Sequence, residues 1–210
     1  MSTVLLIDDD DDIRQIFTIY LNKKGHTIHS APGGREGIDM LGTVHPDLIL
    51  LDIMMPGMDG WETLCAIKKN PATKNLPVTM CSGKQPDRDE INRYGKYIED
   101  YLLKPLELPK LSDALVSIIQ HYRKQTAEME SLKNKIPDHQ MIDEFYDCQK
   151  TLRILEKISK LLTSGSREIE ADIRRYKTHM QEICGSQGDP YFRGALAPSP
   201  KLNKSGVSNI

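Results

Sequence analysis

Short apolar stretches alternate with helix-like spacing along the first 121 residues. The stretches at residues 3–8, 27–31, 47–52, 77–82 and 99–104 have the length and composition of buried strands. The third stretch is apolar at consecutive positions, as central strands of a parallel sheet are when both of their faces are covered. The pattern therefore predicts five strands in this part of the chain.

A helix is predicted after each strand. The first is marked by apolar residues at intervals of three and four, before Gly25 ends the pattern: Ile13, Ile16, Phe17, Tyr20 and Leu21. The others are expected over residues 34–44, 61–69, 88–94 and 109–122. This alternation predicts an α/β fold, a doubly wound five-stranded parallel sheet of the flavodoxin-like order 2-1-3-4-5, in which ligands bind at the carboxyl ends of the strands.

Residues 122–184 have a different pattern, which is helical throughout. One apolar stripe steps by fours and threes over residues 141–162, and a second does so over residues 169–183. Between the stripes, Gly165 suits the end of one helix and Ser166 suits the start of the next. The simplest structure is an antiparallel helical hairpin.

Two placements of this hairpin are consistent with its stripes. It forms a self-contained or oligomerisation element, or both stripes pack on the α/β domain, and the sequence leaves this choice open. Pro137 breaks any helix that continues from Tyr122. We divide the chain into a domain at residues 1–121, the helical region at 122–184, and a tail at 185–210 that is rich in Gly, Pro and Ser and is expected to be disordered.

The composition is that of a soluble globular protein and removes several classes of function. Of the 210 residues, 39% are hydrophobic and 28% are charged, and no apolar run approaches the roughly 20 residues of a membrane span. The start, MSTVLLIDDD, has no basic region, which argues against a signal peptide and favours a cytoplasmic location. The four cysteines form no CxxC pair and no HExxH pattern occurs, so we expect neither disulfides nor a thiolate or histidine metal site.

The net charge of −2 is unevenly distributed. Residues 1–121 carry 13 Lys and Arg against 18 Asp and Glu, whereas residues 122–184 carry 12 against 11. No segment is as basic as the body of a dedicated DNA-binding protein. The cluster of Arg174, Arg175 and Lys177 is not followed by a turn and a recognition helix, and we interpret it as a solvated helix face.

Acidic residues mark the carboxyl ends of two strands that are neighbours in the predicted order. Asp8 and Asp9 end the first strand, and Asp52 ends the third. Three carboxylates at one edge repel one another unless a cation lies among them, and oxygen ligands of this kind favour Mg²⁺ or Mn²⁺ paired with a phosphate. Ser82 and Lys104 end the next two strands, so a hydroxyl and an ammonium group converge on the carboxylates. This set suits the stabilisation of a phosphoryl group on a carboxylate.

These motifs resemble the receiver domain of two-component response regulators. The resemblance covers residues 3 to about 121 and rests on four motifs in order: Asp8-Asp9, LLDIMMPGMDG around Asp52, PVTMCSG around Ser82 and YLLKP around Lys104. It implies a CheY-like phosphoacceptor protein rather than an enzyme with its own substrate. It also implies a sensor histidine kinase as the phosphoryl donor and Mg²⁺ as the cofactor.

The resemblance further implies roles for the acidic residues. Asp52 would accept the phosphoryl group from a phosphohistidine. Asp8, Asp9 and Asp52, together with the backbone carbonyl of Met54, would bind Mg²⁺, which offsets the charge of the phosphoryl oxygens. Lys104 would pair with a phosphoryl oxygen.

Two further residues would carry the signal outward. Ser82 would hydrogen-bond the phosphate, and Tyr101 would turn inward behind it, which changes the surface formed by the fourth helix, the fifth strand and the fifth helix. Plain core packing is the alternative role for Tyr101. Pro105 lies where receivers commonly have a cis peptide bond.

The chain departs from the family pattern in two places. Met54 and Lys84 occupy positions that modulate the access of hydrolytic water, and because an apolar side chain at Met54 cannot orient water, we predict slow self-dephosphorylation. The fifth helix has no Lys or Arg between Lys110 and Arg123 to meet acidic residues such as Asp100. Dimerisation through salt bridges on that face is therefore not expected.

Two hypotheses for the output follow. In the first, residues 122–184 bind a protein partner or form a homodimer when Asp52 is phosphorylated. In the second, the chain is a transcriptional regulator whose helical region contacts DNA. The region is similar in length and helical make-up to the HalX-type modules of some archaeal receivers, although no motif is shared. A hydrolase that uses Asp52 as its nucleophile is disfavoured because no acid/base carboxylate lies two residues beyond it.

Overall fold

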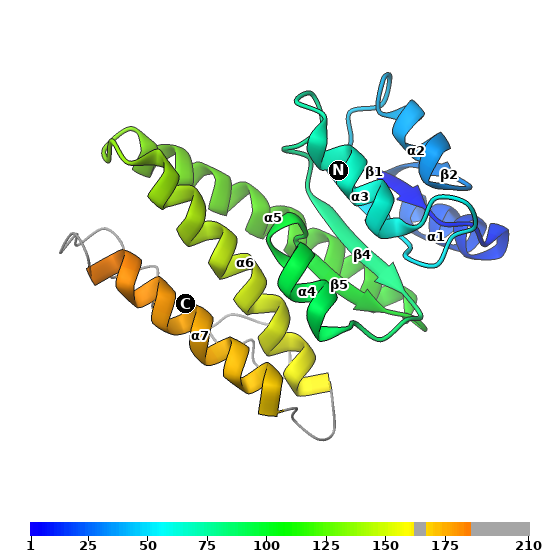
Figure 1. Ribbon diagram of the computed structural model, residues 1–210. Coiled ribbons are helices and arrows are strands. Elements are labelled where there is room, and N and C mark those ends of the chain that lie inside the picture. Colours follow the sequence, from blue (N-terminus) through cyan, green and yellow to red (C-terminus); the bar gives the residue numbers. More distant parts are fainter. Residues whose placement is uncertain (162–166, 186–210) are drawn as a thin grey trace.

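The structure, a computed structural model, describes residues 1–161 and 167–185 (Figure 1). The described part contains a five-stranded sheet of order β2-β1-β3-β4-β5, and every strand pair is parallel. Its strands, in chain order, are β1 (Thr3–Ile7), β2 (Thr27–Ala31), β3 (Leu48–Leu51), β4 (Val78–Ser82) and β5 (Asp100–Leu103). The predicted fold class and strand order are confirmed.

Helices follow all five strands, and two more helices complete the described chain. They are α1 (Asp11–Lys23), α2 (Gly34–Met40), α3 (Gly60–Lys69), α4 (Arg88–Tyr94), the 3₁₀ turn η1 (Gly95–Tyr97), α5 (Leu108–Lys133), α6 (His139–Leu161) and α7 (Arg167–Gly185). The predicted helix at residues 34–44 was too long, because the backbone tightens into turn hydrogen bonds from Leu41 onward. The helix predicted to end at residue 122 continues to Lys133, because Met129 and Leu132 pack into an apolar cluster with α6 and α7.

Local sequence signals fix the helix starts that border the carboxyl edge of the sheet. Asp10 caps α1 by accepting hydrogen bonds from the backbone N–H groups of Asp12 and Ile13. A Cβ atom on Gly60 would lie 2.2 Å from the carbonyl oxygen of Asp52, so only glycine lets α3 begin this close to the end of β3. The tight start of α3 holds the backbone of Asp52 in place.

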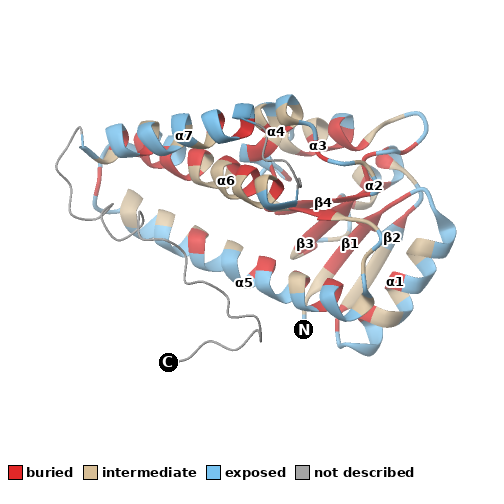
Figure 2. Cartoon of the chain, turned by 90° about the horizontal axis from the view of Figure 1, so that it is seen from below, coloured by how far each residue is buried: buried red, intermediate tan, exposed pale blue. Residues whose placement is uncertain are grey.

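Two apolar layers cover the sheet. One contains residues of α1 and α5 packed against β1 and β3, among them Phe17, Leu21, Leu111 and Leu115. The other contains residues of α2, α3 and α4 and also four residues of the hairpin: Ile154, Leu155, Ile158 and Ile169. The three central strands β1, β3 and β4 are buried between the layers (Figure 2), as their largely apolar sequences predict, whereas the edge strand β2 is mostly half-buried.

The hairpin prediction is also confirmed. Helices α6 and α7 run antiparallel (Figure 1), and ion pairs join Lys177 to Glu156 at 2.7 Å and His179 to Glu144 at 2.9 Å. The structure combines the two placements left open by the sequence. Ile154, Leu155, Ile158 and Ile169 pack on the α/β domain, whereas Met141, Phe145, Met180 and Ile183 form a separate cluster with the end of α5. Its proposed caps, Gly165 and Ser166, lie outside the described residues.

The domain boundaries stay predictions, and one of them falls within a helix. Helix α5 crosses residue 121 without a break, so the helical region is continuous with the α/β domain at that point. At the other end, Gly185 is the last residue of α7, and the rest of the predicted tail, residues 186–210, lies outside the described residues. None of the helices in the described ranges is long and apolar enough to span a bilayer.

Candidate functional site

The carboxyl edge of the sheet brings one ammonium group against two carboxylates. Lys104 follows β5, and its Nζ lies 2.5 Å from Oδ2 of Asp8 and 3.0 Å from Oδ1 of Asp52. Asp8 and Asp52 follow β1 and β3, whose pairing places them side by side. Three residues separated by up to 96 positions therefore meet at one point, as their places at strand ends predicted.

Both carboxylates are buried, and this sets their electrostatics. Asp8 is 1% exposed and Asp52 is 4% exposed. Burial raises the pKa of Asp8, although the hydrogen bond and charge of Lys104 act in the opposite direction. Burial by itself would lower the pKa of Lys104, but its hydrogen bonds and ion pairs with the two carboxylates raise it. The edge thus holds more negative charge than one lysine neutralises.

The second oxygen of Asp52 is held by the backbone. Its Oδ2 accepts a hydrogen bond of 2.7 Å from the N–H group of Met54, whose side chain is 59% exposed. Asp9 is exposed, and the structure does not bring it together with Asp8 and Asp52. In the described ranges, no three His, Cys, Asp or Glu side chains are gathered as a metal-ligand group.

The donor set nevertheless fits Mg²⁺. Asp8 and Asp52 offer only oxygen atoms, and Asp9 lies next to Asp8 in the chain at the exposed rim. Mg²⁺ binds proteins through one or two carboxylates, keeps several waters and takes further oxygens from a phosphate. A cation here would also relieve the excess negative charge that Lys104 leaves.

Ser82 and Tyr101 are both placed inside the fold. Ser82 is fully buried at the end of β4, and its Oγ accepts a hydrogen bond of 3.4 Å from the N–H group of Lys84. Tyr101 is 2% exposed, and its hydroxyl donates a hydrogen bond of 2.7 Å to the carbonyl oxygen of Lys84. The tyrosine thus already points inward, and both predicted switch residues contact the same residue. The peptide bond between Lys104 and Pro105 is cis, as predicted.

Two residues of the site were missed in the sequence. Arg14 on α1 donates a hydrogen bond of 2.7 Å to the backbone oxygen of Asp8 and so steadies the acidic edge. Glu90 on α4 accepts hydrogen bonds from Lys84 at 2.5 Å and from the indole of Trp61 at 3.0 Å. Asp87 and Glu90 form a capping box at the start of α4, a local pattern that gives no sign of these contacts.

The comparison with protein families agrees with this geometry. The family profile described as "Response regulator receiver domain" matches residues 4–116, which is more than half of the chain. The chain belongs to the response regulator receiver family. The match covers the sheet from Val4 onward and the first third of α5, so it contains every residue proposed for the site.

The chain is also similar in sequence to individual regulatory proteins. The chain is 30% identical over 138 residues to the transcriptional regulatory protein AfsQ1 of Streptomyces coelicolor, and 33% identical over 137 residues to the uncharacterized transcriptional regulatory protein YcbL of Bacillus subtilis. These alignments cover 66% and 65% of this chain. They cover 60% and 59% of the two relatives, so the chain spans about three fifths of their length.

A solved receiver has the same fold. The CheY-like receiver domain protein from Methanospirillum hungatei is 33% identical, with a TM-score of 0.52. The superposition covers 97% of that protein and 58% of this chain. The likeness thus concerns the receiver, and the α6–α7 hairpin has to be interpreted from its own contacts.

Proposed function

We propose that this receiver accepts a phosphoryl group on Asp52 from a sensor histidine kinase of a two-component system. The observation that carries the proposal is the shared contact of Lys104 with Asp8 and Asp52, since it supplies a cation at the carboxylate that would be modified. Both acids are buried, so their charges act in a poorly solvated place where an ammonium group is most effective.

The phosphoryl transfer is a single displacement at phosphorus. An oxygen of Asp52 attacks the phosphorus atom, the bond from phosphorus to the imidazole nitrogen of the donor breaks, and that nitrogen keeps the electron pair. An acyl phosphate forms on Asp52. Lys104 pairs with one phosphoryl oxygen, and the hydroxyl of Ser82 donates to another.

We further propose that Asp8, Asp9, Asp52 and the carbonyl oxygen of Met54 hold Mg²⁺ during this transfer. Receivers as a family use this ion, and it supplies positive charge to the phosphoryl oxygens when bound. Burial disfavours the charged form of Asp8, and a bound divalent cation would stabilise that form. The proposed reactions are the gain and the loss of the phosphoryl group on Asp52.

The output proposed is a protein interaction or dimerisation through residues 122–184. The alternative, DNA contact through the arginine cluster, gains no support from the side chains. Arg175 lies 3.5 Å from Asp172 and Lys177 lies 2.7 Å from Glu156. Arg174 lies 4.0 Å from Glu170, so each basic group has an acidic neighbour on the protein itself. Such groups are less available to phosphates.

The test treats the protein with acetyl phosphate and Mg²⁺ and measures the intact mass. The wild type is expected to gain one phosphoryl group, and Asp52→Asn is expected to gain none. Asp59→Asn is the matched control, because Asp59 lies in the same loop but caps α3, and asparagine is an equally good cap. Equal modification of wild type and Asp52→Asn would disprove the assignment.

A further inference from the structure

The α6–α7 hairpin is bound to the receiver through two acidic residues at the start of β5. Glu99, which is 2% exposed, pairs with Lys150 at 2.5 Å and with Arg153 at 3.6 Å. Asp100 pairs with Lys157 at 2.7 Å. The three basic residues follow one another at intervals of three and four along α6, so a single helix face meets both acids. The partner that Asp100 lacks on α5 is supplied by α6.

A neighbouring face of α6 is buried in the same apolar cluster as Tyr101. Ile154, Leu155 and Ile158 of α6 belong to one buried cluster with Tyr101 and Ile98. Because all five are at most 2% exposed, the tyrosine ring has no solvent-filled space to turn into while α6 stays in place. The inward Tyr101 and the docked α6 are thus buried in one cluster.

The second helix of the hairpin, α7, is hydrogen-bonded to α4. Asp172 of α7 is 3% exposed, and its Oδ2 accepts hydrogen bonds from Nε of Arg88 at 2.5 Å and from Nδ2 of Asn92 at 2.8 Å. Arg88 is the first residue of α4, one turn away from the loop that follows Ser82. A buried carboxylate with these donors keeps α4 against α7, since its charge has few other partners.

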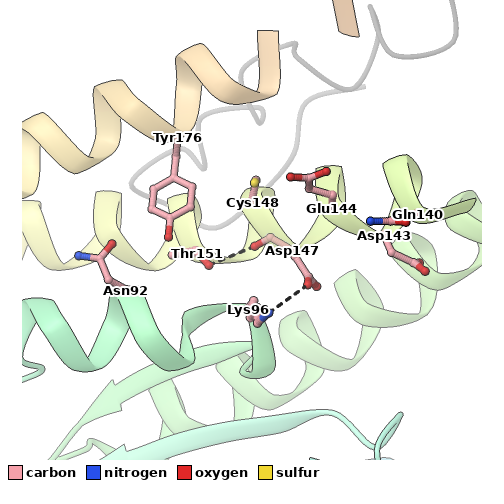
Figure 3. A pocket seen from close by; sticks show the side chains of 9 residues that line it. All are labelled: Asn92, Lys96, Gln140, Asp143, Glu144, Asp147, Cys148, Thr151 and Tyr176. Atoms are coloured by element: carbon pink, nitrogen blue, oxygen red, sulfur yellow. Dashed lines mark hydrogen bonds and ion pairs between the residues drawn. The ribbon is translucent and has the colours of Figure 1, made fainter. Parts of the chain in front are cut away.

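The seam between these two contacts is not closely packed. A pocket of about 400 Å³ opens there (Figure 3), with Asn92 and Lys96 on one side, Asp147 of α6 on another and Tyr176 of α7 above. Lys96 and Asp147 approach only to 4.0 Å across it. The hairpin is thus held by its polar contacts at β5 and α4, by the apolar cluster that contains Tyr101, and by the cluster that α6 and α7 form with Met129 and Leu132 of α5.

Both contacts converge on Lys84. The hydroxyl of Tyr101, held by α6, donates to the carbonyl oxygen of Lys84 at 2.7 Å. Glu90, on the turn of α4 that α7 grips through Arg88, lies 2.5 Å from Nζ of Lys84. Lys84 is two residues after Ser82 and donates its backbone N–H to the Ser82 hydroxyl. Lys84 thus contacts Ser82, Tyr101 and Glu90 at once.

We propose that the hairpin is an intramolecular ligand of the α4–β5 face, and that it holds Tyr101 and Lys84 in the arrangement in which Ser82 is ready for a phosphoryl group. This inference rests on the function proposed above. The docked hairpin and the phosphoryl-binding site belong to one state, so each stabilises the other. Phosphorylation then tightens the hairpin on the receiver, and a partner must recognise the combined surface.

The experiment measures the affinity for beryllofluoride, a phosphoryl analogue, in the presence of Mg²⁺ by calorimetry on the full chain. Asp172→Asn removes the ion pair between α7 and Arg88 of α4, and Lys157→Gln removes the ion pair between α6 and Asp100 of β5. Each is expected to lower the affinity about fivefold or more, the lower end of typical coupling between sites. The control is Lys177→Gln, which removes an ion pair with Glu156 inside the hairpin and should bind like the wild type.

The outcomes separate the two proposals. If the wild type fails to bind, or if Asp52→Asn binds equally well, the proposed function is wrong. If the wild type binds through Asp52 and both hairpin variants match it, the coupling alone is wrong. Unchanged far-UV circular dichroism of the variants checks that they are folded.

Hydrogen exchange of the wild type provides a second reading that needs no variant. Backbone amides of α6 and α7 are expected to exchange more slowly when beryllofluoride and Mg²⁺ are bound. Faster exchange would mean that the hairpin is released, and unchanged exchange would mean that it is not coupled. Either result would overturn the proposal.

Discussion

Lys104 Nζ lies 2.5 Å from Asp8 Oδ2 and 3.0 Å from Asp52 Oδ1, so one ammonium group joins the ends of β1, β3 and β5. The contact neutralises part of a buried negative charge, and it does so at the carboxylate proposed to be phosphorylated. The same residue therefore contributes to stability and to function, and the two contributions can be separated.

Replacing Lys104 by methionine is expected to destabilise the fold. Removing one partner of a buried ion pair costs about 3–5 kcal/mol, and because the Lys104 side chain is 15% exposed we expect about 3 kcal/mol. Urea unfolding measures this change. The control, Lys110→Met, removes an exposed pair with Glu107 and should cost under about 1 kcal/mol. Millimolar Mg²⁺ should stabilise both proteins, because both keep the proposed carboxylate ligands, and the absence of any response in the two proteins would contradict the proposed cation site.

The grip of α7 on α4 is expected to weaken in acid. Burial by itself would raise the pKa of Asp172, but hydrogen bonds from Arg88 and Asn92 and the charges of Arg88 and Arg175 lower it below the ordinary value of 3.8. Because the folded pKa is lower than the unfolded one, the stabilisation is present above that ordinary value and is lost as the pH falls through the folded pKa.

Asp172→Asn removes this part of the acid dependence. The midpoint of urea unfolding, followed between about pH 5 and 3, should fall less steeply for this variant than for the wild type. The control is Glu170→Gln, whose carboxylate is 4.0 Å from Arg174 on the exposed side of the same helix. Parallel curves for wild type and Asp172→Asn would show that Asp172 has no such role.

The acyl phosphate is expected to be long-lived. The side chain of Met54 is 59% exposed at the rim of the site and has no polar atom that could orient a water molecule toward Asp52. Met54→Asn supplies an amide there and should shorten the lifetime about tenfold, less than the 10²–10⁴ of a true general base. The decay is followed by intact mass with Mg²⁺ and no kinase. A wild-type lifetime of seconds would contradict the prediction.

A methyl group at Gly95 is expected to lift α6 from the receiver. A Cβ atom there would lie 3.0 Å from Cγ2 and 3.2 Å from Cα of Thr151, which is too close for the backbones of η1 and α6 to keep their positions. Gly95→Ala should therefore cost about 1–3 kcal/mol in thermal unfolding, the usual range for overpacking. Gly185→Ala, where a Cβ meets no atom within 4 Å, is the control and should be near neutral.

Much of the site was predictable because its residues lie at or next to the ends of strands, which the local sequence pattern marks. A strand that is apolar on consecutive positions is central in a parallel sheet, and the first polar residue after it lies at the carboxyl edge. Asp8 and Asp52 follow from this rule, and Ser82 and Lys104 lie at the same edge because they are the last residue of β4 and the first residue after β5. Asp9 follows the same strand but is exposed, since adjacent residues point to different sides, and its role as a Mg²⁺ ligand stays a prediction.

The hairpin shows the limit of this reasoning. Its apolar stripes indicated two amphipathic helices, but a stripe records only that one face is buried and not what covers it. The partners of Glu99 and Asp100 lie more than fifty positions away on α6, and the two residues of α4 that donate hydrogen bonds to Asp172 lie eighty or more positions away. Nothing in the local sequence predicts these contacts between distant segments.

The sequence by itself determined the α/β class, the strand order and the residues that meet at the carboxyl edge of the sheet, because chain direction and apolar periodicity constrain a parallel sheet strongly. Only the tertiary structure decided that α5 continues to Lys133, that the hairpin packs on β5 and α4, and that the basic residues of α6 neutralise the acids of that face. The physical reason is that burial and charge compensation depend on distances between segments far apart in the chain, which no local pattern encodes.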